Sequence, residues 1–153
     1  MASQYTNRGI YRMMKAAFQG DALPTQFYIA LVTDAVAPTR ATNTFSELTE
    51  VPAGNGYTAG GTAVPRNSTH FDVANEDDSN NRALVQMADK VWTAATGNLP
   101  SSGTGARYAI LTDDNATQAN REIWAYFDLV ANRVVSVGQT LTLSNAELRI
   151  EPQ

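Results

Sequence analysis

The amino-acid sequence predicts an all-β domain, either an antiparallel β-sandwich or a jelly-roll-like fold, with one N-terminal α-helix. The 153 residues are 43% hydrophobic and only 17% charged, a balance typical of a packed β-protein. Short runs rich in aromatic and β-branched residues alternate with turn residues, and one N-terminal segment has clear helical spacing. This length suits one domain, residues 1–153, which we divide into a helical arm (1–20) and a β-sandwich (21–153).

The N-terminal helix is predicted by apolar residues that recur at i, i+3, i+4, i+7 and i+8. These residues are Ile10, Met13, Met14, Ala17 and Phe18. The Asn7 side chain can cap the start of the helix, and Gly20 can end it in the left-handed conformation, so we expect a helix over 8–19. The apolar stripe must pack against other residues, and we expect these to belong to the same domain rather than to a neighbouring subunit.

Residues 26–33 form the clearest predicted strand, because the run QFYIALVT is apolar on both alternating faces. A polar loop follows over 34–43, and Thr44 and Glu47 then have capping-box spacing, which permits one short helical turn. The other predicted strands cover 62–66, 71–74, 83–93, 106–112, 122–130, 139–143 and 147–151.

Residues 83–93 also fit a helical stripe, but the polar loops on both sides favour a strand. The large apolar residues on the most strand-like runs should form the core. They are Phe27, Ile29, Leu31, Ile110, Trp124, Phe127, Leu141 and Leu143.

A glycine-rich segment over 53–67 has four glycines around one tyrosine. It lacks the Walker spacing and the Lys-Ser or Lys-Thr pair of a phosphate loop, so we interpret it as a structural turn. We expect positive φ at Gly56 or Gly60, and a tyrosine packed against the domain or a neighbour. The turn residues are Gly54, Gly56, Tyr57, Gly60 and Gly61.

No group of residues in the sequence points to catalysis. The chain has no cysteine, its one histidine is His70, and no nucleophile motif accompanies that histidine. The acidic segments 76–78 and 113–115 do not match an EF-hand, and their Asp and Asn residues are typical of turns. We therefore expect no catalytic residue, no cofactor and no metal site.

The charge and the hydropathy pattern argue against nucleic acid and membrane as partners. A net charge of −4 leaves no excess of basic groups to neutralise phosphates. The chain has no apolar run near the ~20 residues that span a bilayer, and no signal-peptide pattern at its start. We expect it to fold in the cytoplasm of the cell that makes it.

A series of motifs spread over residues 26–150 resembles small virion structural proteins of tailed bacteriophages. In chain order the motifs are FYIALVT, LTEVPAGNGYTAGGTAV, VWTA, ARYAILTDD, IWAYFDL and GQTLTLSNAELRI. The resemblance implies a non-enzymatic component of the virion, made in the cytoplasm of a host bacterium. It implies either a capsid decoration or cement protein that stabilises the shell, or a neck or tail appendage that attaches a fibre or binds a host surface or glycan. The absence of heptads and repeats favours the first.

Assembly with other chains is expected from the strand edges and the N-terminal segment. Lysine blunts strand edges, and the chain has only Lys15 and Lys90, so its edges are candidates for pairing. We expect a homodimer or homotrimer, with residues 1–20 in contact with another virion protein, the major capsid protein in the decoration hypothesis. The candidate interface residues are Tyr5, Tyr11, Met13, Met14 and Phe18.

Overall fold

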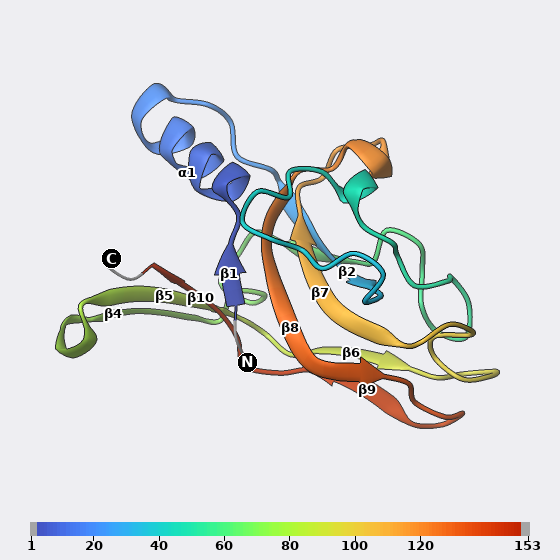
Figure 1. The fold of residues 1–153 in the computed structure, drawn as a ribbon. Coiled ribbons are helices and arrows are strands. Elements are labelled where there is room, and N and C mark those ends of the chain that lie inside the picture. The colour runs from blue at the N-terminus through green and yellow to red at the C-terminus, as the bar shows by residue number, and fades with distance from the viewer. Residues whose placement is uncertain (1–2, 151–153) are drawn as a thin grey trace.

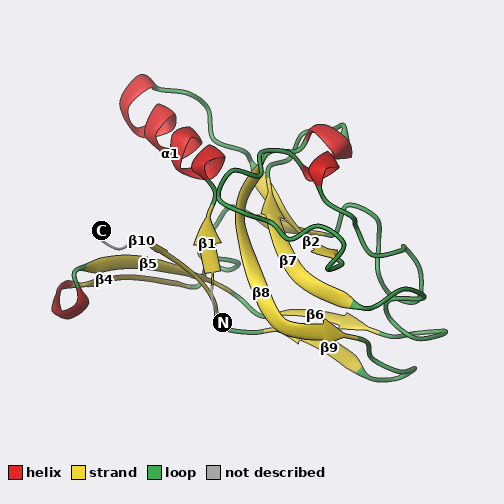
Figure 2. Ribbon diagram, viewed as in Figure 1, coloured by secondary structure: helices red, strands yellow, loops and turns green. Residues whose placement is uncertain are grey.

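The computed structural model describes residues 3–150, which form mostly antiparallel β-strands with one α-helix near the N-terminus (Figure 1; Figure 2). The helix is α1 (Asn7–Gln19), and three single-turn 3₁₀ helices are η1 (Phe45–Glu47), η2 (Asp78–Asn80) and η3 (Gln118–Asn120). The strands are β1 (Ser3–Tyr5), β2 (Gln26–Val32), β3 (Thr62–Pro65), β4 (Val73–Asp77), β5 (Arg82–Met87), β6 (Lys90–Thr93), β7 (Ala106–Thr112), β8 (Ile123–Arg133), β9 (Thr140–Leu143) and β10 (Ala146–Ile150). The predicted β class with an N-terminal helix is confirmed.

The strands form three sheets in the described part of the chain. The largest has five strands in the order β1-β8-β7-β2-β3, and the smaller ones have the orders β10-β5-β4 and β6-β9. Every pairing between these strands is antiparallel. Two of the elements, α1 and the β4–β5 hairpin, extend beyond the same end of the body (Figure 1).

Apolar side chains cover both faces of the five-stranded sheet. The larger cluster joins that sheet to strands of the two smaller sheets, through residues such as Ile29, Phe127, Met87 and Leu143. A smaller cluster on the other face contains Ala30, Val32, Phe45, Ile110 and Ile123, so the η1 segment covers that face. This explains why β2 is apolar at consecutive positions. All eight predicted core residues are buried, the most exposed being Leu141 at 8%.

Three strand predictions need correction. Residues 83–93 are strand rather than helix, as predicted, but they form two strands with a break at 88–89, because Met87 pairs with Ala146 and Lys90 pairs with Leu143 in a different sheet. The strand predicted at 71–74 lies at Val73–Asp77, where pairing with β5 outweighs the low strand propensity of Asn and Asp. Strand β1 was not predicted, since a segment of three residues is too short to show an alternating pattern, yet it pairs with β8.

The residue that caps α1 is Thr6, and the prediction of Asn7 is wrong. Thr6 Oγ1 accepts a hydrogen bond from the Gly9 amide at 2.9 Å and donates to the Ile123 carbonyl at 2.5 Å. The hydroxyl thus accepts a hydrogen bond from a free amide of the first helical turn and also joins the helix to β8. A cap at Asn7 would not make both contacts. The helix ends as predicted at Gly20, whose φ is 74°.

The first turn of α1 lies directly on β8. A Cβ placed on Gly9 would lie 2.3 Å from the Trp124 carbonyl oxygen, so only glycine permits this approach. The Thr6 amide donates to the same carbonyl at 3.0 Å. One turn further along, Arg12 Nε donates to Glu122 Oε2 at 2.5 Å. The root of the helix is therefore fixed by backbone contact, hydrogen bonds and an ion pair.

Gly9→Ala should destabilise the protein, although alanine normally stabilises a helix by roughly 0.5–1 kcal/mol relative to glycine. The added methyl group meets the Trp124 backbone, which cannot move aside as a side chain could, and overpacking of this kind costs about 1–3 kcal/mol. Urea unfolding measures the change. Asn7→Ala, on an exposed position of the same turn, is the control and should stay within about 0.5 kcal/mol. A Gly9→Ala protein more stable than the wild type would contradict the contact.

Candidate functional site at the N-terminal helix

Beyond its root, α1 leaves much of its apolar stripe uncovered. Gly9 is the only buried residue of the helix. Met13 packs against the large core, whereas Met14 is 56% exposed and Phe18 is 83% exposed. Tyr11 is also exposed, at 49%. The domain therefore covers its apolar stripe, as expected, only on the side of Met13. Among the candidate interface residues, Tyr5 and Met13 pack against the core, whereas Tyr11, Met14 and Phe18 are exposed.

The helix also carries positive charge. Its basic residues are Arg8, Arg12 and Lys15, and it contains no acidic residue. Arg12 pairs with Glu122, and Lys15 Nζ lies 2.7 Å from Asp21 Oδ2. The hydrogen bond that the Lys15 ammonium donates to the Asp21 carboxylate raises the pKa of Lys15 above its ordinary value, so this cation stays charged at neutral pH. Arg8 Nη1 also lies 3.5 Å from Glu122 Oε1, so each cation of the helix has an acidic partner within the chain, and the exposed part of α1 is mainly apolar.

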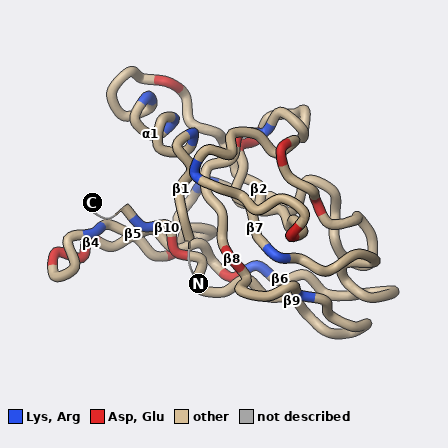
Figure 3. Tube along the Cα trace, viewed as in Figure 1, with Lys and Arg blue, Asp and Glu red and all other residues tan. Residues whose placement is uncertain are grey.

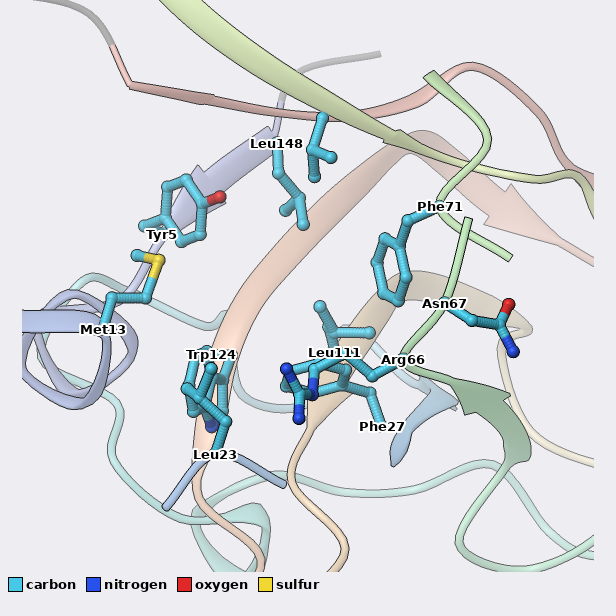
Figure 4. Close-up of a pocket in the computed structure, with 11 residues that line it drawn as sticks. Tyr5, Met13, Leu23, Phe27, Arg66, Asn67, Phe71, Leu111, Trp124 and Leu148 are labelled. Atoms are coloured by element: carbon cyan, nitrogen blue, oxygen red, sulfur yellow. The ribbon is translucent and has the colours of Figure 1, made fainter. Parts of the chain in front are cut away.

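An apolar pocket of about 340 Å³ lies beside α1, between the five-stranded sheet and the β10-β5-β4 sheet (Figure 4). The residues that line it are Tyr5, Met13, Leu23, Phe27, Arg66, Asn67, Phe71, Val85, Leu111, Trp124 and Leu148. Phe27 contacts Phe71 and Trp124 edge to face, with ring centroids 5.8 and 5.0 Å away. A second hollow of about 350 Å³ shares Met13, Leu23 and Arg66, and it continues along the last turns of α1.

Two hydrogen-bond donors lie among these apolar residues. Trp124 Nε1 is buried and has no hydrogen-bond partner in residues 3–150. Trp92 Nε1 is also buried without a partner there, but Trp92 does not line the pocket. The Arg66 guanidinium donates through Nε to the Pro24 carbonyl at 2.8 Å, which leaves its terminal nitrogens free for another acceptor. Burial raises the pKa of Tyr5 to about 12, so its phenol remains neutral. Because the Trp124 N–H is buried, the pocket offers an incoming group an apolar lining with the Arg66 guanidinium as a donor at its edge.

The glycine-rich turn has the geometry that its sequence predicts. Gly56 and Gly60 have φ values of 102° and 82°, and Tyr57 is 3% exposed. The Tyr57 hydroxyl accepts from the Leu31 amide at 3.0 Å and donates to Glu50 Oε1 at 2.7 Å. Burial, followed by the nearby Glu50 carboxylate, raises the pKa of Tyr57 far above its ordinary value. These contacts are internal to the domain, which gives the turn a structural role.

The remaining polar candidates also bond within the domain. His70 Nδ1 lies 3.0 Å from Asn67 Oδ1. Asp77 bonds Asn80 and Arg82, and these contacts, the Asn80 bond first, lower its pKa. Asp114 accepts hydrogen bonds from the amide and hydroxyl of Thr25. Across residues 3–150, no three His, Asp or Glu side chains are grouped to hold a metal, and no helix has the length and apolarity of a membrane span.

Comparison with protein-family models, curated proteins and solved structures found no match for this chain. The candidate site thus rests on the residues themselves. Sequence reasoning identified Tyr5, Met13 and the exposed residues of α1, but it missed the rest of the pocket lining. Residues such as Arg66, Phe71 and Leu148 come from distant parts of the chain, and no local pattern connects them.

Tyr57→Phe should lower the free energy of unfolding by about 1–3 kcal/mol, because it leaves the buried Leu31 amide without an acceptor. Chemical denaturation measures this loss. Tyr126→Phe is a matched control, since that hydroxyl bonds only the exposed Gln4 side chain, at 2.8 Å, and its loss should change stability by less than about 0.5 kcal/mol. Equal effects from the two variants would show that the Tyr57 hydroxyl has no special structural role.

Proposed function

We propose that the protein is a non-enzymatic structural component of a tailed-phage virion, a capsid decoration or cement protein that stabilises the shell. The resemblance over residues 26–150 supports a virion protein. The outward face of α1 supports a role in contact with another chain. The partners in this proposal are further copies of the protein and the major capsid protein.

The observation that carries the proposal is the uncovered apolar surface of α1. Tyr11, Met14 and Phe18 are all exposed on a helix whose root is held firmly against β8. An exposed apolar group of this kind marks a protein contact in many soluble proteins. Aromatic and methionine side chains are frequent at interfaces.

The β-strands form a body that is suited to a protein present in many copies on one particle. We propose a sandwich-type architecture, in which the five-stranded sheet faces the two smaller sheets across the larger core. Such a body holds α1 in one orientation. A weak contact through α1 then gains strength when many copies bind a symmetric shell, because each bound copy raises the effective concentration of the next contact.

Met14→Glu should reduce incorporation into particles by about tenfold or more, because it places a charge in the centre of the proposed contact. The measurement is the number of copies per purified particle, by quantitative gel or mass spectrometry. Val91→Glu is the matched control, since Val91 lies on β6 and is also 56% exposed. Both variants should keep the wild-type circular dichroism.

Normal incorporation of a folded Met14→Glu protein would contradict the role of α1. Deletion of residues 1–20 is a weaker test, because it also removes β1 from the five-stranded sheet. Electron microscopy of particles with and without the protein separates the two virion positions. Extra density on the shell supports decoration, and density at the neck or tail would favour an appendage instead.

A further inference from the structure

We propose that the pocket beside α1 is a binding site for a medium-chain carboxylate, a small molecule with one apolar chain of about 8–12 carbon atoms. The chain lies among the apolar residues of the lining, and the carboxylate binds the Arg66 guanidinium at the edge of the pocket. Such a site is compatible with a capsid or a tail position, so it does not depend on the proposed function.

The volume of the pocket sets the size of the ligand. An apolar cavity of roughly 150 Å³ accommodates benzene. The pocket measures about 340 Å³, a little more than twice that volume, so a chain of about 8–12 carbon atoms fits. The pocket adjoins the second hollow at Met13, Leu23 and Arg66, which gives the ligand a route of entry beside α1.

The lining suits an apolar chain. The residues that the chain contacts come from α1 and from both neighbouring sheets (Figure 4), and they include Met13, Phe27, Leu111, Val85 and Leu148. Burial keeps the phenol of Tyr5 neutral, and none of the described residues that line the pocket is acidic. An anionic ligand therefore meets no like charge in the lining.

Arg66 recognises the charged end of the ligand. Its side chain is exposed, and Nε donates to the Pro24 carbonyl at 2.8 Å. Within residues 3–150, no carboxylate pairs with this guanidinium. Its two terminal nitrogens form a planar fork of the kind that binds a carboxylate through two parallel hydrogen bonds. The edge of the pocket thus holds a cation whose counter-charge a ligand can supply.

The acid in the adjoining hollow does not neutralise Arg66. Helix α1 carries basic residues only, and an acidic residue follows it closely, as Figure 3 shows. This residue is Asp21, whose carboxylate lies 2.7 Å from Lys15 Nζ and 3.8 Å from Arg12 Nη1. Asp21 therefore compensates the charge of α1 and leaves the charge of Arg66 for a bound anion.

Two other classes of ligand fit the pocket less well. A neutral hydrocarbon fills the apolar space but leaves Arg66 without a counter-charge. A phosphate monoester carries about 1.5–2 negative charges at neutral pH, which exceeds the one cation of the lining. An apolar chain with one carboxylate matches both the lining and the charge.

Decanoate should bind the wild-type protein at one site, with a dissociation constant on the order of 10–100 μM by isothermal titration calorimetry. Octanoate should bind about tenfold more weakly, because it buries two methylene groups fewer and each is worth about fourfold in affinity. Equal affinities for the two acids, or no saturable binding of decanoate up to ~1 mM, would overturn the inference.

Arg66→Gln should weaken decanoate binding about tenfold, because the carboxylate loses its charged partner. The affinity for decanol, which has the same chain without the charge, should change less than about twofold. Arg40→Gln is the matched control, since it removes the same charge from another exposed arginine that lies outside the pocket. Wild-type affinity of Arg66→Gln for decanoate would contradict the role of the guanidinium.

Val85→Trp should abolish the binding of decanoate and decanol alike, because the larger side chain fills the pocket. Val73→Trp is the control, since Val73 lies on the neighbouring strand β4, is 40% exposed and does not line the pocket. Circular dichroism shows that both variants are folded. A folded Val85→Trp protein with wild-type affinity would place the ligand elsewhere.

Amide chemical shifts locate the ligand on the wild-type protein without any substitution. Titration with decanoate should shift the amides of Arg66, Phe71 and Val85 most. Shifts centred on the exposed side chains of Val91 and Val137, outside the lining, would overturn the site. Sedimentation velocity gives the last check, because an oligomer that decanoate dissociates would assign the pocket to another protein chain instead.

Discussion

The contact between Gly9 and the backbone of Trp124 determines the arrangement of the N-terminal part of the molecule. Because no Cβ intervenes, the first turn of α1 reaches the β8 backbone, and the Thr6 hydroxyl and the Arg12 ion pair hold it there. Beyond this first turn, no residue of the helix is fully buried. Its later turns leave the body, which exposes Met14 and Phe18 and leaves the apolar pocket beside Met13.

Some polar groups of the domain bond only to one another, and others keep a hydrogen-bond donor that is free to bind another molecule. Tyr57, Glu50 and the amides of Leu31 and Gly60 satisfy one another, and such a network stabilises the fold without offering a site. Arg66 differs, because its guanidinium is exposed beside an apolar pocket and donates only through Nε, to the Pro24 carbonyl. The chemistry of the molecule therefore points to recognition of an apolar group at this pocket.

The candidate site was predictable only in part. The stripe of α1 identifies the side chains able to make contacts, since helical spacing places them on one face whatever the surroundings. Which of them the domain itself covers depends on the angle between α1 and β8, and that angle is decided by Gly9, a residue that the stripe does not include. The pocket has no signal in the sequence, because Tyr5, Phe71 and Leu148 are brought together only by the folded sheets.

The sequence alone determined the β class, the end of α1 at Gly20, the buried residues of β2 and the positive φ of Gly56 and Gly60. Each follows from local chemistry, namely β-branched and aromatic runs or the freedom of glycine. Only the tertiary structure decided the cap at Thr6, the pairing of β1, and the division of residues 83–93 between two sheets. These features depend on partners more than fifty residues away along the chain, and the energy of such long-range contacts outweighs local propensity.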